Sequence, residues 1–152
     1  MRKIKKTILV CAMLMVSLTV NAQSKGESYD WSKLIDAIAM VESKGNPKAF
    51  NPNGNCVGLL QITPGLVKQC NIWFQAKKSK KRYTLADRYD VQKSKEMFVM
   101  VQSYYNKTND VEKAIRIWNG GPWYTIKGTN GYLKKVMKYY NGGGWASIFC
   151  FF

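Results

Sequence analysis

The stretch that decides the fold runs from Ile35 to Pro64 and reads IDAIAMVESKGNPKAFNPNGNCVGLLQITP. Its first part has the spacing of an amphipathic helix, because apolar residues recur every three or four positions. These residues are Trp31, Leu34, Ile35, Ile38 and Val41. Gly45 and the Asn46-Pro47 pair end the pattern. We therefore predict a helix over about residues 31–44, with Asp30 as its N-cap.

Glu42 lies along the apolar stripe of this helix, seven positions after Ile35 and four after Ile38. A carboxyl group near a helix C-terminus faces the negative end of the helix dipole, and apolar neighbours disfavour its charged form. Both effects raise the pKa, which suits a general acid at neutral pH. The competing interpretation is a solvated surface glutamate, the more common state of this residue type.

The rest of the chain is rich in helix signals and poor in strand signals. Residues 48–57 form a turn cluster that favours a short hairpin. Thr63-Pro64 is typical of a helix start, and Asp90 and Asp110 are placed to cap two later helices. Thr129–Gly131 is predicted to open the last helix. The pattern indicates one small, mainly α-helical domain.

Three motifs follow one another in a recognisable order. The first motif consists of Glu42-Ser43, the loop Asn51-Pro52-Asn53-Gly54 and the segment GLLQITP at residues 58–64. Later come AIRIWNGGP at residues 114–122 and YLKKVMKYY at residues 132–140. This order resembles the active-site signature of the soluble lytic transglycosylases and goose-type lysozymes, which cleave the glycan strands of peptidoglycan. The resemblance spans about residues 31–140 and implies a lysozyme-like fold, with about five helices around a cleft and a small β element or hairpin.

The resemblance implies a reaction that needs one acid. Glu42 would protonate the glycosidic oxygen of the β-1,4 bond between N-acetylmuramic acid and N-acetylglucosamine, and would then deprotonate the 6-hydroxyl to close a 1,6-anhydro ring. Glycoside hydrolysis usually takes two carboxylates. No Asp or Glu occurs between residues 43 and 86, which argues against a second acid from that loop.

Alternative functions stay open. One is a hydrolytic muramidase, and another is a basic wall-binding module without activity. A third is a secreted binder of nucleic acid or membranes, driven by charge alone.

The resemblance also assigns substrate-binding residues. Gln61 and Asn119 match polar positions of the family motifs, and Trp118 stands where the family has Tyr. Asn51 stands near the family's loop serine, and Tyr139 belongs to the closing motif. Trp118 keeps an aromatic face for a sugar but lacks a phenolic hydroxyl.

The N-terminus reads as a signal peptide over residues 1–22, with a basic start, an apolar run from Thr7 to Val20 and a small-residue site ending at Ala22. The run is too short for an ordinary membrane span. Cleavage there predicts a periplasmic or secreted domain over residues 23–144, followed by an apolar tail over residues 145–152. The tail either folds back on the domain or contacts a partner or membrane.

Charge and cysteines bear on partners. The net charge is +15, and removing the four basic residues of the signal peptide leaves +11. The partner we expect is peptidoglycan, with no nucleic acid and no stable membrane span; membership of a cell-envelope machine stays open.

In an oxidising compartment Cys56 and Cys70 are candidates for a disulfide that would bracket the segment 58–64. The chain has no His and no metal-ligand spacing, so we expect no metal and no cofactor.

Overall fold

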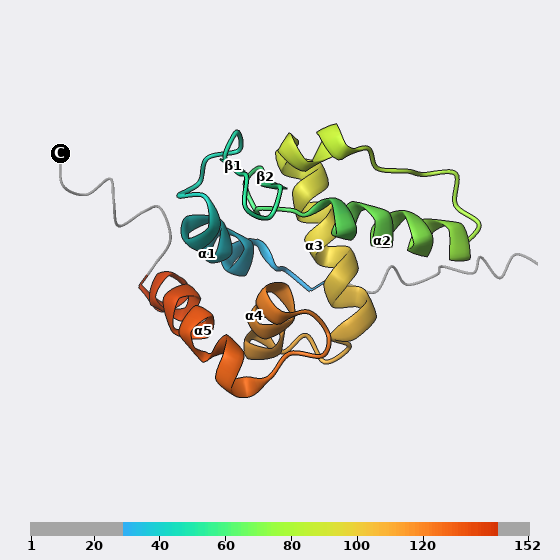
Figure 1. The fold of residues 1–152 in the computed structure, drawn as a ribbon. Helices are drawn as coiled ribbons and strands as arrows, with labels where there is room; N and C mark the ends of the chain where they lie inside the picture. The colour runs from blue at the N-terminus through green and yellow to red at the C-terminus, as the bar shows by residue number, and fades with distance from the viewer. Residues whose placement is uncertain (1–28, 143–152) are drawn as a thin grey trace, which may run out of the picture.

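The computed structural model describes residues 29–142, which form five α-helices, one 3₁₀ helix and one two-stranded hairpin (Figure 1). In chain order the elements are α1 (Ser32–Glu42), β1 (Phe50–Asn51), β2 (Cys56–Val57), α2 (Pro64–Ala76), η1 (Leu85–Tyr89), α3 (Val91–Tyr105), α4 (Val111–Gly120) and α5 (Ile126–Asn141). The prediction of a mainly α fold with a small hairpin is confirmed. The predicted signal peptide and the apolar tail lie outside the described residues.

The catalytic candidate sits at the end of a buried helix. The stripe predicted for α1 is largely removed from solvent, with Leu34, Ile35 and Ile38 exposed by 3% or less. α1 packs against α5, and α5 packs against α4 (Figure 1). Each fully buried side chain of this size contributes roughly 1.5–3 kcal/mol through the hydrophobic effect. This packing fixes the axis of α1, and with it the position of Glu42 at its last turn.

The hairpin and the segment after it form one side of the fold. β1 and β2 are antiparallel, with Phe50 opposite Val57 and Asn51 opposite Cys56. Val57 also bridges to Ile62, so the segment 58–61 is a tight loop closed on itself. Leu60 and Ile62 enter the core with exposures of 0% and 1%.

Three predicted helix caps are confirmed. The side chain of Thr63 accepts a hydrogen bond from the Leu66 amide, and Pro64 is the first residue of α2. Asp90 accepts from the Lys93 amide at 2.8 Å, and Asp110 from the Lys113 amide at 2.6 Å. Each cap satisfies an amide that has no partner inside its helix.

Two boundaries differ from the predictions. α1 begins at Ser32, so Trp31 rather than Asp30 is in the N-cap position. Asp30 lies one residue before the N-cap, and its side chain accepts a hydrogen bond of 2.9 Å from the Ser32 amide. α5 begins at Ile126 rather than near Thr129, because Thr125 caps it by accepting from the Gly128 amide. Glycine is a poor helix former, yet Gly128 lies in the first turn of this helix. Among residues 29–142 no helix is long and apolar enough to cross a membrane.

Candidate active site

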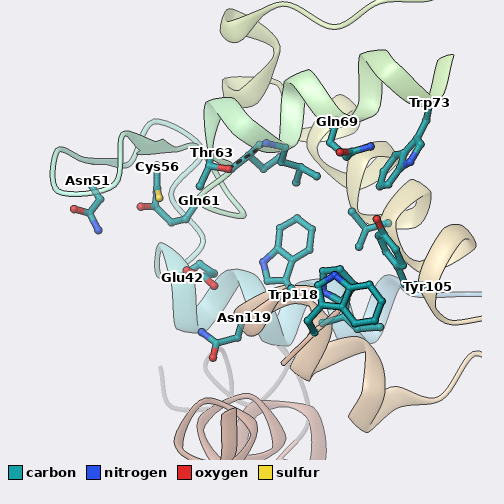
Figure 2. A pocket seen from close by; sticks show the side chains of 17 residues that line it. Glu42, Asn51, Cys56, Gln61, Thr63, Gln69, Trp73, Tyr105, Trp118 and Asn119 are labelled. Carbon is teal, nitrogen blue, oxygen red and sulfur yellow. Dashed lines mark hydrogen bonds between the residues drawn. The ribbon is translucent and has the colours of Figure 1, made fainter. Parts of the chain in front are cut away.

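A cavity of about 630 Å³ lies beside the C-terminal end of α1. Figure 2 shows Glu42, Asn51, Cys56 and Gln61 at one end of it, Gln69, Trp73 and Tyr105 at the other, and Trp118 between them. The walls come from α1, the hairpin, α2, α3 and α4 together with the loop after α4. Segments far apart in the sequence therefore meet around one long, open site.

The carboxyl group of Glu42 is half-buried and lines this cavity. Its Oε1 accepts a hydrogen bond of 2.5 Å from the hydroxyl of Tyr132 on α5. Burial raises the pKa of Glu42 above its usual range, and the Tyr132 hydrogen bond acts in the opposite direction by stabilising the carboxylate. Because burial is the larger cause, the site favours a protonated carboxyl group at higher pH than an exposed glutamate would.

Tyr132 stays a hydrogen-bond donor over the whole working range of pH. Its own burial is the main cause that raises its pKa, and the negative charge of Glu42 adds to the effect. The phenol therefore keeps its proton and holds one oxygen of Glu42 in place. Glu42 also lines the cavity, so its carboxyl group is within reach of a ligand bound there.

Ser43 joins the acid-bearing helix to the loop that faces it. Its hydroxyl donates to the Leu59 carbonyl at 2.8 Å and contacts the Ala39 carbonyl at 3.2 Å. Gln61 lies in the same loop with a left-handed backbone, at φ 51°. Its Nε2 donates to the Gly58 carbonyl at 3.1 Å. The amide side chain is thus partly used by its own loop and presents its remaining polar atoms to the cavity.

Arg88 holds this loop from behind. Its guanidinium, only 5% exposed as a residue, donates to the carbonyls of Asn55 at 2.7 Å and Ile62 at 3.2 Å. The Arg88 carbonyl lies so close to Gly58 that a Cβ at that position would come within 2.0 Å of it. Gly58 also has φ 80°, which favours glycine. One buried arginine therefore sets the position of the loop that carries Gln61.

Aromatic side chains line the half of the cavity away from the acid. Trp118 packs against Phe98 with ring centroids 5.1 Å apart, which leaves it half-buried with one side in the cavity. Trp73 stacks on Tyr104 at 4.2 Å and also contacts Tyr105. Trp123 follows Gly121-Pro122 at the rim and is 91% exposed. Flat aromatic faces in a cleft suit the apolar faces of sugar rings.

Most of the residues singled out in the sequence meet in this cavity. Glu42, Asn51, Gln61, Trp118 and Asn119 all line it. Their roles in binding stay predictions, whereas their proximity is a feature of the fold. Tyr139 does not line the cavity; it lies in a separate hollow with Val41 and three lysines. α5 therefore presents Tyr132 rather than Tyr139 to the acid.

The candidate disulfide between Cys56 and Cys70 is not formed in the structure, where both side chains are free thiols. Cys56 lies on β2 at the cavity, and its thiol donates to the Gly54 carbonyl at 3.5 Å. Cys70 lies on the inner face of α2 with 0% exposure, where burial raises the pKa of its thiol to about 12. The helix directs Cys70 into the core, away from the hairpin.

No second acid lines the cavity among residues 29–142. Asp87 instead closes a capping box with Thr84 and pairs with Lys93 at 2.6 Å, and Asp90 caps α3. In the same part of the chain no group of three or more His, Cys, Asp or Glu side chains is placed to hold a metal ion.

Sequence reasoning missed Tyr132 as a partner of the acid and named Tyr139 of the same motif instead. It also missed Trp73, Tyr105 and Trp123 as lining residues. Tyr132 belongs to the last of the three motifs, so the signal was present. The sequence does not give the angle at which α5 crosses α1, and this angle decides whether Tyr132 reaches Glu42.

Comparison with protein families gave a match. The family model described as the transglycosylase SLT domain matches residues 19–127, which is more than half of the chain. Searches of curated proteins and of solved structures gave no match. The chain belongs to the transglycosylase SLT domain family, and this membership supports a peptidoglycan-cleaving activity in general.

Proposed function

We propose that this protein is a lytic transglycosylase that cleaves the bond between N-acetylmuramic acid and N-acetylglucosamine with Glu42 as its single acid and base. The observation that carries the proposal is the setting of Glu42. It is half-buried at one end of a long cleft, has a raised pKa and is held by Tyr132, and no other acid of the described residues lines that cleft.

In the first step the protonated carboxyl group of Glu42 donates its proton to the glycosidic oxygen as the bond from that oxygen to C1 of N-acetylmuramic acid breaks. The positive charge that develops at C1 needs stabilisation, and among residues 29–142 no second carboxylate lines the cleft to supply it. The 2-acetamido group of the substrate supplies it instead, through its carbonyl oxygen.

In the second step Glu42, now a carboxylate, removes the proton of the 6-hydroxyl of the same sugar. The 6-oxygen bonds to C1, the acetamido group is released and a 1,6-anhydro ring closes. Glu42 ends the cycle protonated, as it began, and no water is consumed. The Tyr132 hydrogen bond assists the first step instead, because it stabilises the carboxylate that forms as Glu42 gives up its proton.

The shape of the cleft supports a polymeric substrate. The acid lies at one end, and the aromatic half extends away from it through Trp118 to Trp73 and Tyr105 (Figure 2). Several consecutive sugars can bind along such a groove, which favours a glycan strand over a small glycoside.

We further propose that the protein is exported and acts in the periplasm or outside the cell. The basic start, apolar run and small-residue site of residues 1–22 support this. Edman sequencing of protein recovered from the cell exterior or periplasm is expected to begin at Gln23. A start at Met1 in that fraction would contradict the proposal.

The experiment that tests the reaction is mass analysis of products from purified peptidoglycan, digested in ¹⁸O-labelled water. We expect fragments with anhydro ends, one water lighter than reducing ends and free of the label. Labelled reducing ends would instead identify a hydrolytic muramidase. Binding to the wall without any released fragment would favour the non-catalytic module.

A further inference from the structure

A second hollow lies next to the active site, between the end of α1 and α5. It has a volume of about 290 Å³ and is lined by Val41, Lys44, Lys135, Lys138 and Tyr139. Val41 directly precedes Glu42 in the chain, and Lys44 follows it by two residues. Along α5, Lys135 and Tyr139 lie one and two turns beyond Tyr132, or roughly 5 and 10 Å. The hollow is therefore adjacent to the acid without being part of the cleft.

The three lysines have no carboxylate partner within residues 29–142. The ion pairs in this part of the chain use Lys81, Lys93, Lys95 and Arg116. α5 contains four lysines and no acid. The Nζ of Lys44 lies 5.9 Å from the centre of the Tyr139 ring, so the tyrosine face helps to hold that ammonium group over the hollow. Three lysines that line one hollow attract an anion.

We propose that this hollow binds a carboxylate of the peptide carried by the substrate strand. The inference rests on the proposed function, because N-acetylmuramic acid, whose C1 bond is cleaved at Glu42, also carries the peptide on its lactyl group. The peptide must therefore leave the strand close to Glu42, and its carboxylates fall within reach of the next turns of α5. The hollow gives the enzyme a preference for strands that carry free peptide carboxylates.

The test measures binding by full-length Glu42→Gln protein, which keeps the strands intact. Three probes are compared: glycan strands with peptides that end in free carboxylates, the same strands after chemical amidation of those carboxylates, and strands stripped of peptide by an amidase. We expect the first probe to bind about three- to tenfold more tightly than the other two, with a difference that shrinks in high salt.

The hollow is then altered by Lys135→Gln together with Lys138→Gln. Both lysines are exposed, so the variant is expected to keep its melting temperature. The matched control is Lys68→Gln together with Lys80→Gln, which removes the same charge from exposed lysines that line neither the cleft nor the hollow. Loss of the preference in the first variant alone supports the proposal.

Two results would overturn it: equal binding of free and amidated strands by the parent protein, or an equal loss in both double variants. Cleavage by the wild-type protein is scored separately. A protein that prefers carboxylate-bearing strands but cleaves none would refute the proposed function and leave the peptide site standing. A protein that cleaves all strands without preference would support the proposed function and refute the peptide site.

Discussion

The hydroxyl of Tyr132 on α5 donates a 2.5 Å hydrogen bond to Oε1 of Glu42 at the end of α1, although the two residues are 90 positions apart in the chain. This contact ties the acid to the helix that closes the fold. It also sets the balance between the two protonation states of Glu42, because burial favours the neutral acid and the phenol favours the carboxylate.

Replacing Tyr132 by Phe removes the hydrogen bond that lowers the pKa of Glu42 and leaves the burial that raises it. The pKa is then expected to rise further, so the high-pH limb of the pH–kcat profile moves to higher pH. The value of kcat itself falls, because a weaker acid donates its proton less readily in the first step. Tyr140→Phe is the matched control, since that ring faces Lys33 rather than the acid. A Tyr132→Phe profile that shifts to lower pH, or that matches the control, would contradict this role.

The buried acid is expected to lower stability. Burial raises the pKa of Glu42 in the folded state. The stability that belongs to the protonated form is therefore fully present below the unfolded pKa of about 4.3. It is lost as pH rises through the folded pKa and the buried carboxyl group becomes charged. At pH 7 Glu42→Gln should therefore melt at a higher temperature than wild type, since the neutral amide needs no charge in a half-buried site.

Thermal melts at pH 7 and near pH 3 check this point. The gap between Glu42→Gln and wild type should be clear at pH 7 and close to zero near pH 3. A variant that is less stable than wild type at pH 7 would show that the carboxylate is well solvated, against the geometry.

Arg88 is predicted to be a large stabilising residue although it contacts no substrate. Arg88→Ala removes the buried guanidinium that donates to the carbonyls of Asn55 and Ile62 and should cost about 2–4 kcal/mol in the free energy of unfolding. Arg82→Ala is the control, because that side chain is exposed and bonds only nearby carbonyls. Urea denaturation measures both, and equal losses would refute the assignment.

At Trp123 an effect on substrate binding can be measured apart from an effect on folding. With 91% of its surface exposed, it packs on little of the domain, so Trp123→Ala should leave the melting temperature within error of wild type. If its ring stacks on a sugar at the rim of the cleft, KM should rise about two- to tenfold with kcat unchanged. Tyr89→Ala removes an exposed aromatic residue outside the cleft and should change neither. An unchanged KM in Trp123→Ala would place the sugar elsewhere.

The parts of the structure that depend on neighbours in the chain could be predicted from the sequence. The apolar spacing around Ile38 placed α1 and put Glu42 on its inner side. The caps at Thr63, Asp90 and Asp110 use amides three residues away, so local chemistry was enough to find them.

The parts that depend on how helices cross could not be predicted in this way. Tyr132 and Tyr139 share one face of α5, and only its packing on α1 decides which of them meets the acid. The same holds for Cys70, which the sequence makes a candidate partner of Cys56, while the buried face of α2 directs it into the core.

The most direct test of the account compares wild type and Glu42→Gln for release of soluble fragments from purified peptidoglycan under identical conditions. Loss of the single acid is expected to lower the rate by about 10²–10⁴-fold, with binding to the strands retained, since general acid catalysis contributes about that much. A Glu42→Gln protein that releases fragments within about tenfold of the wild-type rate would contradict the account, because the reaction would then take its proton from another group.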